Sequence, residues 1–395
     1  MTATPAPASS PRTFAGYRRA DGRAGVRNHV LVLSPTGLTS AAATRVASLV
    51  RGTICVTSGY GRGQVAADAK LHFDTLSGLA CNPNVAAVVV LAAGSDIVKT
   101  YVDAIASTGK PVRGFSLPDA HEDALVLVDL GLRAATQFVR DASMLRREPC
   151  GLNELCIAVE CGHSDATSGL VCNPLAGLMT EAVVGAGGQA MFSETVEWTG
   201  AEHLLARRAI DADVADSIVR AVAARERAVR GTGADIRAQN PGPQNKAGGL
   251  TTIEEKALGA ISKGGKQRIS GLLQAAQRPP GPGLFLMDTP FFSPESMTAM
   301  IAGGAQIVLF TTGAGNSYCS LVAPTIKMSA NPKTCALLTE QIDLAAADVV
   351  TGAATLETMG ASAVDKLVAI ASGTLTFGEI VGEGSEVVSR IGASM

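Results

Sequence analysis

The sequence alternates short runs of β-branched residues with longer alanine-rich amphipathic stretches, and this rhythm constrains the fold more than any other feature. Such alternation is typical of βα units, in which helices connect parallel strands. In the N-terminal part we predict strands at 29–34, 53–57, 86–93 and 112–117. Helices are predicted near 39–50, 66–80, 96–108 and 121–145. The sequence therefore predicts an N-terminal Rossmann-like α/β domain over residues 13–147.

After the charged link MLRREPCG the same rhythm restarts and predicts a larger C-terminal α/β catalytic domain over residues 150–395. Its predicted strands are ELCIAVE, QAMFSE, GLFLMD, AQIVLFTT and TIKMSA, and a Gly/Pro/Asn-rich loop at 238–252 interrupts it. Ligands of open α/β sheets bind at the carboxyl ends of the strands. The polar turns that follow these strands are therefore where we look for chemistry.

Composition excludes several classes of protein. The 395 residues carry a formal net charge of −2, and the lysines and arginines form no basic stripe, so a nucleic-acid partner is not expected. The longest apolar run, at 85–93, falls far short of the roughly 20 residues that a membrane helix needs. Residues 1–12 have no signal-peptide core and read as a disordered lead-in. We expect a cytoplasmic protein without membrane contacts.

The eight cysteines include no CxxC pair, which argues against a zinc ribbon. A cytosolic chain of this size does not need disulfides, and none are predicted.

The turn GRGQVA fits the dinucleotide fingerprint G-x-G-x-x-A between a strand and a helix, through Gly61, Gly63 and Ala66. No acidic residue ends a following strand at the required distance, since only Asp74 and Asp96 are available. A nicotinamide oxidoreductase is therefore the weaker interpretation. The alternative is a turn whose glycines let the backbone approach an anion.

Several long blocks resemble the altronate/galactarate dehydratase family, which includes the large subunit of sulfolactate sulfo-lyase. They are GYRRADGRAGVRNHVLVL, ECGHSDATSGLVCNPLAG, MFSETVEWTGAEHLLARRA, NPGPQNKAGGLTTIEEKALGAISKGG, LMDTP and TTGAGNSYCSLVAPTIKMSANP. The resemblance implies a lyase that performs β-elimination on 2-hydroxy carboxylates, with loss of water or, in one branch, sulfite. It also implies iron in the dehydratases, and a small N-terminal domain in longer members that we expect here as a separate small subunit.

The chain departs from the family pattern at the residues that would hold iron. The pattern reads close to HGYGCG, GLGCE and CGGSD, where this chain has SGYGRG, AAGSD and CGHSD. Ser58 replaces a histidine, Arg62 and Ser95 replace cysteines, and Cys161 remains. Iron and iron–sulfur sites depend on thiolates or imidazoles, so the family iron is not expected here. A harder divalent cation such as Mg²⁺ or Ca²⁺, held by Asp165, Glu194 or Glu255, stays open.

Without a metal, another cation must meet the charge that develops on the substrate carboxylate during α-proton abstraction. Arg62 in its glycine-rich turn is one candidate, because a guanidinium binds a carboxylate or sulfonate bidentately. Arg23 and Arg27 precede the first long strand and are further candidates for substrate binding. The alternatives are a surface arginine for Arg62 and a solvated or interdomain salt bridge for the other two.

The segment CGHSDATSG offers candidates for catalysis and anion binding. The hydroxyls of Ser164, Thr167 and Ser168, together with loop N–H groups, are typical of an anion nest and are candidate substrate ligands. The candidate catalytic residues are Asp165, His163, whose imidazole titrates near neutral pH, and Cys161, as an activated thiolate. A solvent-exposed, idle histidine is the alternative for His163.

The segment TTIEEKALG combines a capping signal with a lysine. Thr252 and Glu255 form a capping box, which is the alternative to a catalytic role for Glu255. Lys256 is a candidate base, since a desolvated lysine near a helix start can have a lowered pKa. Polar residues in or after the later strands complete the candidate substrate ligands, namely Asp288, Thr312 and Lys327.

These inferences converge on a lyase large subunit acting on a small acidic 2-hydroxy acid, such as a sugar acid or sulfolactate, within a homo-oligomer. Two alternatives stay open. One is a metal-independent acid/base enzyme of another type, such as an epimerase or a hydrolase, and the other is a non-catalytic subunit that keeps the fold.

Overall fold

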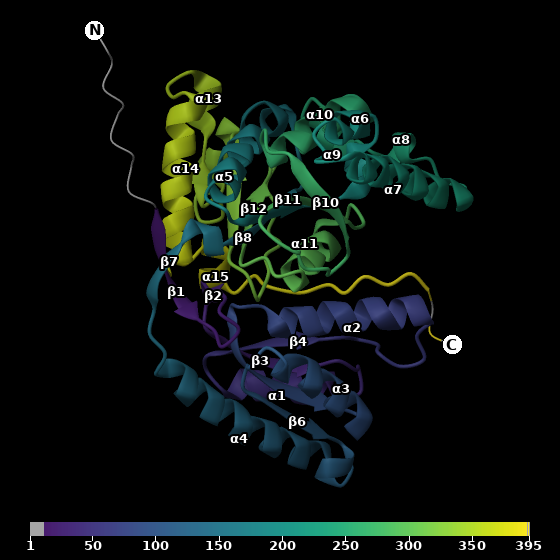
Figure 1. Ribbon diagram of the computed structural model, residues 1–395, viewed down its shortest axis with the longest axis vertical. Coiled ribbons are helices and arrows are strands. Elements are labelled where there is room, and N and C mark those ends of the chain that lie inside the picture. Colours follow the sequence, from purple (N-terminus) through teal and green to yellow (C-terminus); the bar gives the residue numbers. More distant parts are fainter. Residues whose placement is uncertain (1–11, 393, 395) are drawn as a thin grey trace.

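The computed structural model describes residues 12–392 and 394, and two parallel sheets dominate it (Figure 1). The predicted α/β class with Rossmann-like parallel sheets is confirmed. The lead-in predicted at 1–12 lies, apart from Arg12, outside the described residues. In the described part of the chain no helix is long and apolar enough to cross a membrane, and all eight cysteines are free.

The N-terminal sheet has the strand order β4-β3-β5-β6, and all its pairs are parallel. Its strands are β3 (His29–Ser34), β4 (Thr53–Thr57), β5 (Val85–Ala92) and β6 (Val112–Ser116). Its helices are α1 (Ser40–Leu49), α2 (Ala66–Cys81), α3 (Ser95–Ala106) and α4 (Ala124–Ser143). Helices cover both faces, which explains why its central strands are apolar along their whole length.

Alternation along β3 shows how the two faces are filled. Val30 and Val32 pack with α1 and α4, whereas Leu31 and Leu33 pack with α2 and α3. Successive side chains of a strand point to opposite faces, so a run of apolar residues supplies both cores.

The C-terminal sheet has seven parallel strands in the order β10-β11-β9-β8-β12-β13-β14. They are β8 (Cys156–Cys161), β9 (Gln189–Phe192), β10 (Ile269–Gln274), β11 (Gly283–Asp288), β12 (Ile307–Thr311), β13 (Thr325–Ser329) and β14 (Leu344–Ala345). On one side of β8 lie β9, β11 and β10, and after β11 the chain crosses to the other side. Such a switch in strand order is where open α/β sheets bind ligands.

The sheet is covered by α5 (Asn173–Gly185) and α14 (Leu356–Ala371) on one face and by α11 (Ser293–Ala302) on the other. The remaining helices are α6 (Glu202–Ala206), α7 (Ala212–Gly231), α8 (Ile236–Gln239), α9 (Pro243–Ala247), α10 (Ile253–Ile261), α12 (Pro332–Leu337), α13 (Ala347–Thr351) and α15 (Phe377–Val381), with short helical turns that include η3 (Ser168–Cys172), η4 (Thr195–Trp198) and η5 (Ser262–Gly264). The loop expected at 238–252 therefore contains a short helix, α9.

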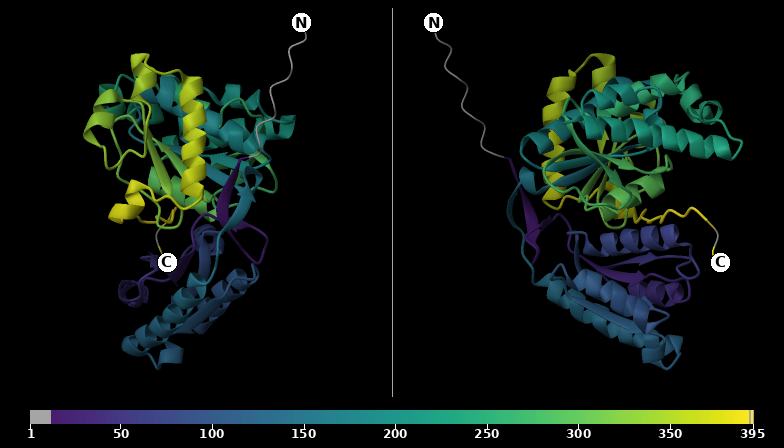
Figure 2. Two further views of the ribbon diagram at one scale, coloured as in Figure 1. Left: turned by 90° about the vertical axis from the view of Figure 1, so that its left-hand side faces the viewer. Right: turned by 45° about the vertical axis from the view of Figure 1, so that its right-hand side comes forward.

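A small antiparallel sheet of β2 (Ala24–Gly25), β1 (Thr13–Arg18) and β7 (Glu148–Gly151) stands where the chain passes between the two large sheets (Figure 2). The two parts also pack directly, because α2 lies against α11. A Cβ atom at Gly78 would lie 2.5 Å from the carbonyl oxygen of Ala302, so only glycine permits this approach. The side chain of Asn82 donates to the carbonyls of Ile301 and Ala305 across the same contact.

Candidate active site

A cavity of about 670 Å³ opens at the carboxyl ends of the central strands of the large sheet. Its walls come from the end of β8, the turn after β9, the start of α11, the loop after β12 and the segment after α15. This is the edge of the sheet at which the sequence predicts chemistry. The polar side chains that line the cavity include Cys161, His163, Ser164, Glu194, Glu197 and Lys256.

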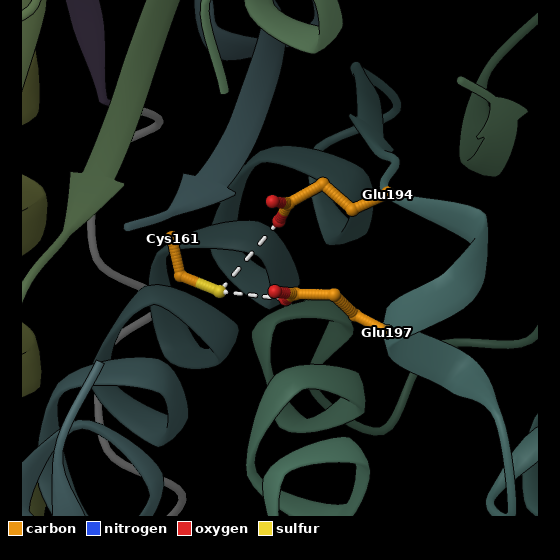
Figure 3. Close-up of side chains that lie close together, drawn as sticks. All are labelled: Cys161, Glu194 and Glu197. Carbon is orange, nitrogen blue, oxygen red and sulfur yellow. Dashed lines mark hydrogen bonds between the residues drawn. The ribbon is translucent and has the colours of Figure 1, made fainter. Parts of the chain in front are cut away.

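Five charged or ionisable side chains meet at the cavity floor, and all are buried. The Sγ atom of Cys161 lies 3.6 Å from Oε2 of Glu194 and 3.3 Å from Oε2 of Glu197 (Figure 3). Lys256 places its Nζ atom 2.6 Å from Oε1 of Glu197. Lys263, behind the cavity wall, places its Nζ atom 3.2 Å from Sγ of Cys161 and 3.0 Å from Oε2 of Glu194. We call these five residues the floor cluster.

Helical periodicity brings the floor cluster together. Glu194 precedes η4 and Glu197 lies within it, so their spacing of three places both carboxylates on one side of a single turn. Lys256 in α10 and Lys263 in η5 are seven residues apart, which is two helical turns and hence one face. The backbone of Glu194 has φ +70°, a left-handed conformation that costs a non-glycine residue free energy and is common at functional sites.

The two carboxyl groups of the floor cluster differ in their pKa values. Burial would raise the pKa of Glu197, but the ammonium groups of Lys256 and Lys263 outweigh burial and lower it. Burial raises the pKa of Glu194 well above its usual range, and the negative charges of Glu160 and Glu197 add to this effect despite the contact with Lys263. Pairs of carboxyl groups whose pKa values are pushed apart are typical of general acid/base sites.

The pKa of Lys256 moves opposite to the expected direction. Burial alone would lower it, but Glu197 outweighs burial and raises the pKa, so Lys256 is held as an ammonium. This corrects the expected lowering, on which the role of Lys256 as a base depended. The pKa of Cys161 is raised well above its usual range by burial and by Glu197, which holds this side chain as a thiol rather than the expected thiolate.

Three side chains of the floor cluster could bind a metal ion, since Cys161, Glu194 and Glu197 each offer a ligand atom and these atoms lie within 4.8 Å of one another. In the described part of the chain this is the only such group of three His, Cys, Asp or Glu residues. It contains a single thiol, whereas an iron–sulfur cluster is held by several. Two of its three donor atoms already contact the ammonium of Lys263. The arrangement therefore does not fit an iron–sulfur cluster.

His163 and Ser164 occupy the cavity wall next to the floor cluster. The imidazole Nδ1 of His163 lies 2.8 Å from the carbonyl oxygen of Gly315, so Nδ1 carries the proton and Nε2 is the free nitrogen. The φ of His163 is +53°, in the region that favours glycine. The hydroxyl of Ser164 is buried and has no hydrogen-bond partner among the described residues.

Asp165 organises the loop after β8. Its carboxylate accepts hydrogen bonds from the Thr167 hydroxyl, from the amide and hydroxyl of Ser168, and from the side chain of Asn331. The Thr167 and Ser168 hydroxyls expected to bind substrate are therefore directed at Asp165, and these three residues do not line the cavity.

Several other predicted site residues lie away from the cavity wall. Arg27 is buried and pairs bidentately with Glu379 of α15, which matches the alternative of an interdomain salt bridge. Glu255 is exposed and accepts from the amide and hydroxyl of Thr251, while its own amide donates to the capping Thr252. Arg62 is exposed on its turn and does not line the cavity.

The three candidate substrate ligands from the later strands, Asp288, Thr312 and Lys327, do not line the cavity either. Asp288 accepts from Thr195 and pairs with Arg225 at 2.9 Å. The hydroxyl of Thr312 accepts from the amide of Gly315. Lys327 is 1% exposed, and its Nζ atom has no hydrogen-bond partner among the described residues. Its nearest carboxylate, 3.8 Å away, is that of Glu383, which lines the cavity.

Sequence reasoning missed Glu197 and Lys263 and considered Glu194 only as a ligand for a hard cation. The spacings Glu194 to Glu197 and Lys256 to Lys263 are the signals that could have found them, because each places two charged residues on one helical face.

Comparison with known proteins gives matches along most of the chain. Residues 152–394 match the family model described as D-galactarate/altronate dehydratase, C-terminal, and residues 16–143 match that described as D-galactarate dehydratase/altronate hydrolase, second domain. The (2R)-sulfolactate sulfo-lyase subunit beta of Chromohalobacter salexigens is 41% identical over 383 residues, which cover 96% of this chain and 98% of that protein.

Two relatives from Escherichia coli are more distant. Galactarate dehydratase (L-threo-forming) is 29% identical over 93% of this chain and 74% of its own length. Altronate dehydratase is 30% identical over 92% of this chain and 74% of its own length.

Proposed function

Because the chain belongs to the galactarate/altronate dehydratase family, we propose that it is a lyase that removes sulfite from a 2-hydroxy-3-sulfonate such as sulfolactate. The observation that carries the elimination chemistry is the floor cluster, where two carboxyl groups with opposite pKa shifts stand beside two ammonium groups at a cavity. The leaving group follows from the sulfo-lyase subunit, which matches this chain along nearly its whole length.

The reaction needs a proton acceptor and a cation. The base takes the proton from C2, the electron pair of that bond forms the C2–C3 double bond, and the C3–S bond breaks with its electron pair on sulfite. The enol product then takes a proton at C3 and loses the proton of its C2 hydroxyl, which gives pyruvate. Negative charge develops on the substrate carboxylate as the C2 proton leaves, so a fixed cation at that position lowers the barrier.

Glu197 and Lys256 supply these functions as an ion pair. Glu197 is ionised, lines the cavity and accepts the proton. Its protonation releases Lys256 from the pair, and the ammonium then faces the growing charge on the substrate carboxylate. His163, with its free Nε2, is the alternative proton acceptor.

A second candidate function is dehydration of a sugar acid, favoured by the raised pKa of Glu194. Hydroxide is a poor leaving group and needs a proton, which a protonated carboxyl group at the cavity can donate. Sulfite departs as a stable anion and needs none. The two functions therefore differ in their demand on Glu194.

We also propose a separate small subunit, because the sulfo-lyase relative is named a beta subunit. The test incubates the purified protein with (2R)-sulfolactate, galactarate or altronate, alone and together with any small protein that copurifies with it. We expect sulfite and pyruvate in equal amounts from sulfolactate, and none from a Glu197→Gln variant. Keto-deoxy acid from a sugar acid without sulfite release would instead support the dehydratase. Turnover of none of the three would contradict both.

A further inference from the structure

Lys263 is the one member of the floor cluster that does not line the cavity, and it is fully buried. Its Nζ atom lies 3.2 Å from Sγ of Cys161 and 3.0 Å from Oε2 of Glu194. Both atoms belong to side chains of the group of three that could bind a metal ion. The same lone pairs therefore serve either an ammonium or a metal.

A metal ion and the Lys263 ammonium cannot both occupy this site, because they would lie close together and repel each other. A metal bound to sulfur and carboxylate oxygen lies about 2.0–2.3 Å from each ligand atom. An ion at that distance from Cys161 and Glu194 would stand within a few ångströms of the Lys263 ammonium, in a site where water does not screen the repulsion.

Each acidic side chain of the floor cluster already contacts an ammonium group. Lys256 pairs with Glu197, and Lys263 contacts Glu194 and Cys161. The ammonium of Lys256 therefore balances the buried charge of Glu197. The ammonium of Lys263 occupies lone pairs of Cys161 and Glu194 that a metal ion would need.

We propose that the ammonium of Lys263 is the resident cation of the floor cluster, that it holds Cys161 and Glu194 in place, and that it excludes a metal ion from them. Removing this charge turns the cluster into a site for one divalent ion with a Cys/Glu/Glu ligand set. The thiol of Cys161 releases its proton to solvent when the ion binds. This inference rests on the donor geometry and does not depend on the substrate.

The test titrates Co²⁺ into the anaerobic full-length protein and into three variants, and follows the thiolate-to-cobalt charge-transfer absorption. Lys263→Met removes the charge with little change in length. Lys263→Arg keeps the charge and is the matched control. The double variant Lys263→Met/Cys161→Ser removes the thiol that produces the signal.

We expect no thiolate-to-cobalt band in the wild-type protein or in Lys263→Arg at one equivalent of Co²⁺. Lys263→Met should develop the band with a stoichiometry of one and bind Co²⁺ at least 100-fold more tightly than the wild type. The double variant should lose the band. These results would show that the floor cluster binds a metal ion only when the Lys263 ammonium is absent.

Two results would overturn the proposal. One is a stoichiometric band in the wild-type protein that Cys161→Ser abolishes, since the ammonium would then not exclude the metal. The other is a folded Lys263→Met protein that gains no band. If Lys263→Met does not fold, Lys263→Gln, which keeps a hydrogen-bond donor, makes the same comparison, and its failure to gain the band counts equally against the proposal.

Discussion

The Nζ atom of Lys256 lies 2.6 Å from Oε1 of Glu197, and both side chains are buried. The lysine also donates to the side-chain oxygen of Asn240 at 2.8 Å, which fixes its position at the cavity wall. This contact explains the opposite pKa shifts of the two residues and makes the pair the first target for mutation.

Lys256→Met should lower the free energy of unfolding by about 3–5 kcal/mol, because it leaves the Glu197 carboxylate buried without its partner. Adding Glu197→Gln should recover part of this loss, since the second change removes the uncompensated charge. Chemical denaturation of both single variants and the double variant measures the coupling. Strictly additive losses would mean that the ion pair does not contribute.

The same pair predicts how stability depends on pH. The raised pKa of Lys256 gives a contribution that is full below the ordinary value of 10.5 and is lost as the pH rises through the folded-state pKa. The lowered pKa of Glu197 gives a contribution that is full above 4.5 and is lost as the pH falls through the folded-state pKa. The stability difference between wild type and Lys256→Met should therefore be greatest between about pH 4.5 and 10.5.

The raised pKa of Glu194 makes the protein less stable as the pH rises, which is opposite to the effect of Glu197. The Glu194→Gln substitution should remove this pH dependence of the stability. With its pKa raised, folded Glu194 holds a proton that the unfolded chain has already lost above pH 4.5, so it makes the wild type less stable as the pH rises from there. Denaturation at several pH values should show a flatter profile for Glu194→Gln than for wild type. The exposed Glu340→Gln is the control, and an unchanged slope in Glu194→Gln would show that Glu194 is ionised.

Glu194→Gln also separates the two candidate reactions. Sulfite release should fall by less than tenfold, whereas dehydration of a sugar acid should fall by on the order of 10²-fold or more, as expected for a lost general acid. Rates with sulfolactate and with galactarate measure the difference. Equal losses on both substrates would assign Glu194 a role common to both.

Lys327→Met should raise KM for a dianionic substrate at least tenfold while kcat changes little, if the buried ammonium moves from Glu383 to the second anionic group of the substrate. The carboxylate of Glu383, 3.8 Å from the ammonium, lines the cavity and is 42% exposed, so a substrate anion can take its place. Steady-state kinetics of Lys327→Met and of the exposed Lys333→Met provide the comparison. Equal effects of the two substitutions would exclude this role.

Arg62→Lys should leave kcat/KM within about threefold of the wild-type value, because Arg62 is exposed and does not line the cavity. This differs from the loss on the order of 10²-fold expected if its guanidinium held the substrate carboxylate bidentately. A loss of that size would show that the turn of the N-terminal sheet reaches the substrate during turnover.

The sequence by itself determined the two parallel sheets, because the strand at 29–34 carries apolar residues that fill both faces and the stretches between strands have helical periodicity. It also indicated the edge of the sheet at which the cavity opens, since Cys161 ends a central strand. These signals are local, because each depends only on residues that are close together in the sequence.

The tertiary structure alone decided which charged side chains face one another. Glu194 and Lys263 are 69 positions apart, and their contact exists because α10 and η5 pack beside the turn after β9. The direction in which the pKa of Lys256 shifts also depends on a distant residue. Burial alone would have lowered this pKa, and the contact with Glu197 raises it. Electrostatic interactions depend on distances in space, and no spacing along the chain records the distances between elements that are joined only by packing.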